Sequence, residues 1–76
     1  MSEITYEIVK SVGIISENEN SKWRRELNLV SWNHGKPKFD IREWSPDHRK
    51  MSRGITLTTD ELQQIVDLYR DFKYMK

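Results

Sequence analysis

Along residues 36–44, with the sequence KPKFDIREW, side chains of two kinds alternate. The apolar residues Phe39 and Ile41 take odd positions, whereas cations and a tryptophan take even positions. These even-numbered residues are Lys36, Lys38, Arg42 and Trp44. Because successive side chains of a β-strand point to opposite faces, the pattern predicts a strand with one apolar face and one cationic face that ends in an aromatic ring. Such a cationic face suits a phosphate backbone with a stacked base.

The chain of 76 residues has room for only one hydrophobic core, so we expect a single domain over residues 1–76 and no separate catalytic domain. A monomer of this size is marginally stable unless a disulfide, a metal or a second subunit adds stability. Because the sequence has no cysteine, disulfides and thiolate metal sites are excluded. Assembly of two copies is the remaining source of stability, which favours a homodimer.

Charge is distributed unevenly along the chain. The formal net charge is only +1, but residues 22–53 contain nine Lys or Arg residues against four Asp or Glu residues, a local excess of five positive charges. The rest of the chain carries an excess of four negative charges. Such asymmetry within one small domain indicates a basic surface patch, and therefore a polyanionic partner.

No stretch of the sequence is suited to a membrane. Apolar runs reach only two or three residues, whereas a spanning helix needs about 20. The opening residues MSEIT also lack the basic start and apolar stretch of a signal peptide. Together with the absence of cysteine, these features predict a soluble, cytoplasmic protein with no membrane partner, associated with the nucleoid through nucleic acid.

Two strands are expected in the first half of the chain. Residues 4–16 are rich in β-branched and aromatic side chains, which favours a strand, and Gly13 within it indicates a bulge or bend. Residues 17–21 form a polar loop, and a second strand covers about residues 23–32. One face of that strand carries Leu27 and Leu29, and the other carries Arg24, Asn28, Val30 and Trp32.

Two more strands follow the first pair. A turn at residues 33–35, in which Gly35 is free to adopt a positive φ, folds the second strand back onto the opening strand as a hairpin. Pro37 lies at the start of the third strand, where its missing amide donor does least harm. A loop at residues 45–50 then leads to a short strand at about residues 54–58.

The last element is a helix with a clear start signal. Thr58 and Glu61 have the spacing of a capping box, in which each side chain satisfies a free backbone amide. Its apolar side chains cover an arc of roughly 180°, wider than one sheet requires. They are Leu62, Ile65, Val66, Leu68, Tyr69, Phe72 and Met75. We expect one side of this arc to cover the sheet and the rest to meet a second copy, in an α+β fold of four strands and one C-terminal helix.

An enzyme is not expected. His34 and His48 lie in predicted loops, where a lone histidine is usually a solvated turn residue, and no pair of histidines has metal-binding spacing. Asp40 and Glu43 point to opposite faces of one strand, so they cannot act as a paired acid and base. No glycine motif for phosphate is present. The sequence therefore predicts no catalytic residue, no metal, no cofactor and no small-molecule substrate.

The basic strands carry the stronger signal. Lys36, Lys38 and Arg42 share one face, and Arg24 and Trp32 join them from the neighbouring strand. Cations that follow a backbone beside rings that stack on bases are typical of proteins that bind single-stranded nucleic acid. A duplex is a poorer fit because the only predicted helix is acidic and apolar and would not enter a groove.

Blander interpretations of these residues remain open. Lysines and arginines on a strand are most often just its solvated face, and Asp40 in their row fits either that interpretation or a salt bridge that orients Arg42. Tryptophans that face solvent on a cationic strand favour binding. Trp23 fits packing at the sheet edge equally well.

Three segments resemble a known family. Residues 40–44 (DIREW), residues 53–57 (RGITL) and the helix opening at residues 59–62 (TDEL), with Lys50 in the loop, are similar to the core of the positive cofactor four family of transcriptional coactivators. The resemblance covers roughly residues 22–74. It implies a curved four-stranded antiparallel sheet followed by one helix, a homodimer formed through the helices, and binding of single-stranded DNA with little sequence preference.

The resemblance also implies site residues. Family DNA contacts fall by position on Lys36, Lys38, Arg42 and a basic residue within residues 49–53. The family's stacking aromatic comes just before a Gly-Lys turn; Asn33 and His34 occupy the nearest places here, and Trp32 comes one or two residues earlier. The full set of candidate nucleic-acid-binding residues is Lys22, Trp23, Arg24, Trp32, His34, Lys36, Lys38, Arg42, Trp44, Arg49 and Arg53.

The expected function is therefore sequence-tolerant binding of single-stranded DNA by a homodimer, in transcription regulation or in replication and repair of melted DNA. One alternative is single-stranded RNA, because stacking and phosphate contacts do not exclude a 2′-hydroxyl. The other alternative is a protein-interaction module that uses the apolar helix.

Overall fold

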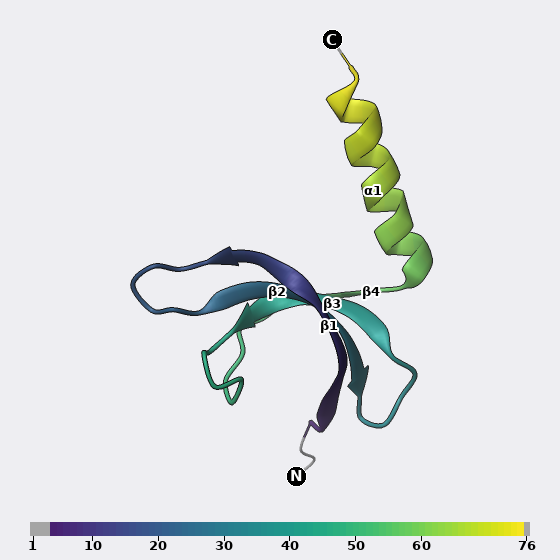
Figure 1. The fold of residues 1–76 in the computed structure, drawn as a ribbon. Coiled ribbons are helices and arrows are strands. Elements are labelled where there is room, and N and C mark those ends of the chain that lie inside the picture. The colour runs from purple at the N-terminus through teal and green to yellow at the C-terminus, as the bar shows by residue number, and fades with distance from the viewer. Residues whose placement is uncertain (1–3, 76) are drawn as a thin grey trace.

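The computed structural model describes residues 4–75 and contains four strands and one helix (Figure 1). In chain order these are β1 (Tyr6–Glu17), β2 (Arg24–Trp32), β3 (Lys38–Trp44), β4 (Ile55–Leu57) and α1 (Thr59–Lys73). The strands form one antiparallel sheet in the order β1-β2-β3-β4. The expected α+β class, with an antiparallel four-stranded sheet followed by one helix, is confirmed.

β1 is longer than the strand it pairs with, and three irregularities absorb the difference. The register with β2 shifts between Ile8 and Lys10, between Ser11 and Gly13, and between Ile14 and Ser16. The predicted bulge at Gly13 is therefore confirmed. Bulges bend a strand, increase its twist and interrupt the row of free amides on an edge. They allow the edge strand β1 to curve along β2.

The turn between β2 and β3 differs from the sequence prediction. Asn33 and His34 have φ values of 50° and 64°, and no glycine in residues 4–75 has a positive φ. The amide of Gly35 donates to the carbonyl of Trp32 at 2.9 Å, which closes the turn. The predicted positive φ at Gly35 was wrong because the two residues before it take that conformation, as in a two-residue hairpin loop. This turn joins β2 to β3, whereas the loop at residues 18–23 joins β1 to β2.

Helix α1 begins as predicted but does not pack as predicted. The hydroxyl of Thr58 accepts the amide of Glu61 at 3.1 Å, and the carboxylate of Glu61 accepts the amide of Thr58 at 2.8 Å. The helix then points away from the sheet, and none of its residues is buried (Figure 1). The expectation that one side of the helix covers its own sheet was therefore wrong for a single chain. Within residues 4–75, no helix is long and apolar enough to cross a membrane.

The two faces of the sheet are covered differently from the prediction. Even-numbered residues of β2 and β3 were expected to face solvent, but most are buried: Glu26, Asn28, Val30, Asp40 and Trp44. The side chain of Tyr6 and the loop at residues 45–52 lie over this face, which we call the even face. The odd face was expected to be the core. Its apolar residues Leu27, Leu29, Phe39 and Ile41 are only half-buried.

Candidate nucleic-acid interface

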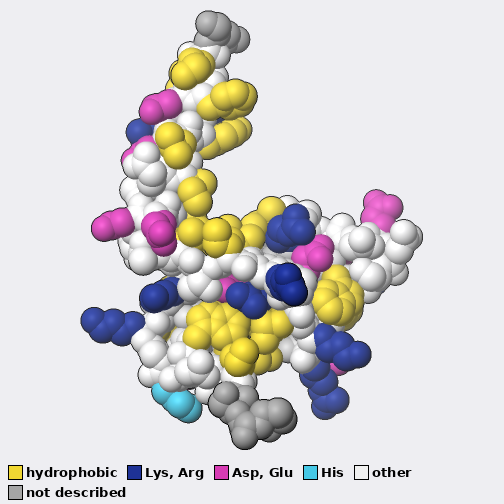
Figure 2. Space-filling model, turned by 180° about the vertical axis from the view of Figure 1, so that it is seen from behind, with side chains coloured by type: hydrophobic (Ala, Val, Ile, Leu, Met, Phe, Trp, Pro, Cys, Tyr) yellow, Lys and Arg dark blue, Asp and Glu magenta, His cyan; other side chains and the backbone are white. Residues whose placement is uncertain are grey.

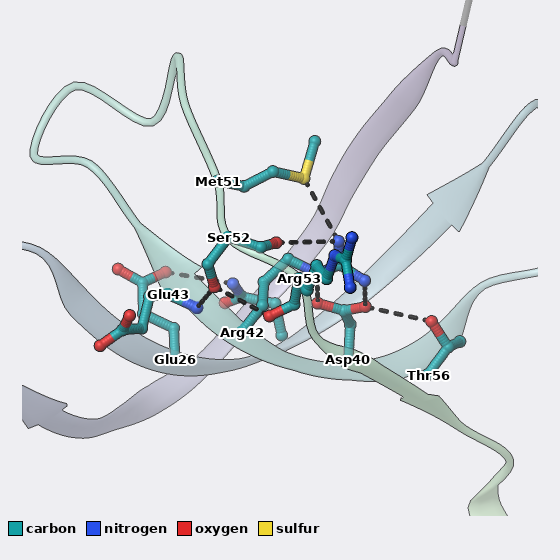
Figure 3. Close-up of polar contacts among 9 residues, drawn as sticks. Glu26, Asp40, Arg42, Glu43, Met51, Ser52, Arg53 and Thr56 are labelled. Carbon is teal, nitrogen blue, oxygen red and sulfur yellow. Dashed lines mark hydrogen bonds and ion pairs between the residues drawn. The ribbon is translucent and has the colours of Figure 1, made fainter.

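A buried ion pair fixes the most central candidate residue. The Arg42 guanidinium donates from Nε to Oδ1 of Asp40 at 2.6 Å and from Nη2 to Oδ2 at 2.7 Å (Figure 3). Asp40 is fully buried, and its Oδ2 also accepts the hydroxyl of Thr56 at 3.2 Å. Of the two roles weighed for Asp40, the salt bridge that orients Arg42 is the one in the structure.

The other side of Arg42 contacts the last residues of the loop at residues 45–52. Its Nη1 lies 3.5 Å from the carbonyl oxygen of Ser52 and 3.4 Å from the sulfur of Met51 (Figure 3). A Cβ atom added to Gly54 would lie 2.4 Å from Cβ of Arg42 and 2.4 Å from the carbonyl oxygen of Ile41. Only glycine allows the chain to pass this close to β3, which gives the Arg-Gly motif a structural reason.

Arg42 is also stacked on an aromatic ring. Its guanidinium carbon lies 4.6 Å from the centroid of the Trp32 ring, within the range of a cation–π interaction. The ring of Tyr6, which is opposite Trp32 in the β1–β2 pairing, lies 5.7 Å from the same ring. Trp32 is half-buried, so the structure brings a cation and two partly exposed rings together on the even face. Parity predicted Trp32 and Arg42 on this face, but gave no signal for Tyr6.

Trp44 lies on the same face and is fully buried. Its ring packs 5.4 Å from the ring of Tyr6 and 5.6 Å from that of His48. The expectation that Trp44 faces solvent beside the cations was wrong, because the loop and Tyr6 fold over it. A buried ring has no free face for a base, so the structure places Trp44 in the core of the domain.

The exposed cations lie around this aromatic cluster rather than within it. Lys36 and Lys38 are exposed, as is His34 in the adjoining turn, and neither lysine forms an ion pair within residues 4–75. Arg49 and Arg53 are exposed in the segment between β3 and β4. Figure 2 shows dark blue side chains gathered over the sheet around an apolar patch. The free cations thus surround a partly exposed aromatic surface.

The remaining candidates lie at the opposite end of β2 from Trp32. Lys22 is exposed in the loop between β1 and β2, and Trp23 beside it is half-buried. Arg24 is half-buried and its Nη2 lies 3.4 Å from the carboxylate of Glu26, so part of its charge is already paired. The structure does not bring Lys22 and Trp23 into contact with the Trp32 cluster.

Sequence reasoning missed one polar cluster altogether. His48 was expected to be a solvated turn residue, but its Nε2 lies 3.0 Å from both carboxylate oxygens of Glu26. Glu26 is buried, with 4% of its surface exposed, and also accepts Nδ2 of Asn28 at 3.1 Å. Twenty-two residues separate His48 from Glu26, so no local spacing could have indicated the pair.

The loop that carries His48 is closed by its own hydrogen bonds. The Ser45 hydroxyl donates to Asp47 at 2.8 Å and accepts the amide of Lys50 at 3.0 Å, and the Ser45 amide donates to the carbonyl of Lys50. Donation from the backbone amide of Arg49, and then from the Ser45 hydroxyl, lowers the pKa of the Asp47 carboxyl. The loop is therefore a compact unit that presents two exposed cations, Arg49 and Lys50.

An open antiparallel sheet with cations around exposed rings is typical of small domains that bind single-stranded nucleic acids. Residues 19–68 match the family Transcriptional Coactivator p15 (PC4), and the chain belongs to this family. The chain is also 44% identical over 63 residues to an uncharacterized protein of Treponema pallidum (strain Nichols). That alignment covers 83% of this chain and 73% of the relative. The resemblance noted in the sequence is thereby confirmed.

Proposed function

We propose that this protein binds single-stranded DNA with little sequence preference, as a homodimer, in transcription regulation or in the replication and repair of melted DNA. The observation that carries the proposal is the Arg42–Trp32 stack, which lies beside the exposed cations Lys36 and Lys38 in a domain of the PC4 family. Residues 1–76 act as one binding domain.

The mechanism is binding alone. Lys36 and Lys38 neutralise phosphates, with Arg49 and Arg53 extending the cationic track along the loop. A base stacks on the exposed part of Trp32, and such stacks contribute about 1–3 kcal/mol each. Arg42 holds the ring in place, since Asp40 already takes two of its donors. Trp44 has no part in binding because it is buried.

Single strands fit this surface better than duplex DNA. A duplex reader places a helix or a ribbon in a groove. Helix α1 has two acidic residues in its first turn, Asp60 and Glu61, which would be repelled by the phosphates that line a groove. Its apolar arc has no hydrogen-bonding groups to contact base edges. The bases of a single strand are unpaired, so one of them can stack on the Trp32 ring at the surface of the sheet.

Helix α1 supports the proposed homodimer. Its apolar side chains are largely exposed in a single chain, with 57% of Leu68 and 70% of Phe72 accessible, and Figure 2 shows them along the helix. The odd face of the sheet is likewise only half-covered. Burial of apolar surface stabilises by about 25 cal/mol per Å². A second copy that covers these surfaces supplies the stability that a domain of this size lacks.

Tryptophan fluorescence tests the proposal. Addition of oligo-dT in low salt is expected to change the emission of Trp32, and salt is expected to weaken the complex strongly. Unchanged emission together with no binding by an independent method would contradict DNA binding. Stronger competition by oligo-U than by oligo-dT would favour single-stranded RNA. A monomer in sedimentation that binds neither polymer would favour a protein-interaction module.

A further inference from the structure

His48 adopts a backbone conformation that is uncommon for residues other than glycine. Its φ is 59°, in the left-handed region, where the Cβ atom crowds the following carbonyl oxygen. Such conformations persist where surrounding contacts determine them, and they gather at functional sites. The contacts around His48 should therefore account for this conformation.

Three elements of the sheet hold His48. Its Nε2 donates to the Glu26 carboxylate of β2, which lies 3.0 Å away through either oxygen. Its ring packs on Trp44 of β3, with an angle of 33° between the planes. Its carbonyl oxygen accepts the hydroxyl of Tyr6 of β1 at 3.2 Å. One loop residue thus ties the loop to three strands.

Glu26 is a suitable anchor because it is itself fixed. A glutamate with 4% exposure is stable only when its carboxylate is hydrogen-bonded or ion-paired. Here Asn28 and His48 donate hydrogen bonds to Glu26, and Arg24 forms an ion pair with it. The loop beyond His48 is closed on itself through Ser45. The end of the loop is held on β3 by the amide of Ser52, which donates to the carbonyl of Glu43, so His48 is the side-chain attachment of its middle part.

We propose that His48 is a positioning residue for nucleic-acid binding. By docking on Glu26, it fixes the middle of the loop at residues 45–52 on the even face and so holds the exposed cations Arg49 and Lys50 in one place relative to β2 and β3. This inference rests on the proposed function and adds to it the means by which the loop cations contribute. His48 itself need not touch the ligand. Without the anchor, Arg49 and Lys50 remain charged but lose their fixed place.

Two substitutions separate the side-chain contact from the backbone conformation. His48→Asn keeps a residue that tolerates the left-handed region but has a side chain too short to reach Glu26. His48→Gln supplies an amide donor at about the reach of the imidazole Nε2. Gln64→Ala, at an exposed position of α1 outside the apolar arc, is the control.

Amide hydrogen exchange and oligo-dT affinity are then measured for each variant. The loop amides of His48 and Lys50 are expected to exchange faster in His48→Asn and to stay protected in His48→Gln and Gln64→Ala. Arg49→Ala with Lys50→Ala should weaken binding roughly threefold to tenfold in the native background, and much less in His48→Asn. In the native background, Arg49→Ala together with Lys50→Ala should lower the salt slope by about 1.4, the value for two phosphates on a single strand.

Each outcome decides the proposal. Unchanged protection in His48→Asn would show that His48 does not fix the loop. Faster exchange with undiminished affinity would show that the loop is held but not for binding. If the native protein binds no DNA, the proposed function and this role fail together, while the exchange data still report whether His48 anchors the loop.

Discussion

Asp40 holds Arg42 through two hydrogen bonds from a fully buried position, and the guanidinium so held lies over the ring of Trp32. The pair therefore supports the proposed binding surface indirectly. An unpaired arginine on an exposed strand could turn toward any nearby phosphate. The guanidinium plane of Arg42 is instead fixed by Asp40 and lies over the Trp32 ring.

Loss of the Asp40 carboxylate should be costly. Asp40→Ala leaves a largely buried guanidinium without its partner, which typically destabilises a protein by about 3–5 kcal/mol. Urea unfolding followed by circular dichroism measures the change in free energy. Glu19→Ala, in the exposed loop between β1 and β2, is the control and should be nearly neutral. A cost below about 1 kcal/mol for Asp40→Ala would contradict the structural role of the pair.

Two tryptophans on one face should respond differently to substitution. Trp32→Ala removes the partly exposed ring and should weaken oligo-dT binding by about 1–3 kcal/mol. Trp44→Phe leaves a gap in the core and should lower the free energy of unfolding by roughly 2 kcal/mol, with affinity unchanged. Titration by anisotropy of a labelled oligonucleotide measures the affinity of both variants, and urea unfolding measures their stability. If Trp44→Phe weakened binding more than Trp32→Ala did, the assignment of roles would be reversed.

Two glycines provide a matched pair. Gly54→Ala puts a Cβ 2.4 Å from the backbone oxygen of Ile41, so β4 must shift, at a cost of about 1–3 kcal/mol. Gly13→Ala meets no atom within 4 Å and its φ is not positive, so it should be neutral or stabilise by up to about 1 kcal/mol. Melting temperatures of the two variants give the comparison. Equal melting temperatures would argue against the close approach of β4 to Arg42.

Because the apolar arc of α1 is exposed and proposed to meet a second copy, charged substitutions on it should disrupt the dimer. Leu68→Glu with Phe72→Glu places two carboxylates on the surface proposed to meet a second copy, and should convert a dimer to a monomer. Gln63→Glu adds a carboxylate on the side of α1 opposite the arc and should leave the dimer intact. Sedimentation velocity distinguishes the two states. A dimer that survives both charges would place the interface elsewhere.

Features set by neighbouring residues could be predicted from the sequence. The capping box depends on Thr58 and Glu61 alone, and the strand pattern on β-branched residues and parity. Burial on the even face could not be predicted, because it depends on where Tyr6 and a distant loop come to lie. The burial of Trp44 and the His48–Glu26 contact both follow from that folding. The turn conformation also differs from the prediction. Asn33 and His34 adopt the positive φ that was expected at Gly35.

The central claim is that free lysines beside Trp32 bind the backbone of single-stranded DNA, and its most direct test is the salt dependence of affinity. Oligo-dT and a duplex of equal length are titrated at two salt concentrations with the native protein and with Lys36→Ala plus Lys38→Ala. Arg70→Ala, at an exposed position of α1 whose guanidinium pairs with Asp67, is the control. We expect tighter binding of oligo-dT than of duplex, and a salt slope reduced by about 1.4 in the double variant only. Equal affinity for the duplex, or a slope unchanged by loss of both lysines, would contradict the claim.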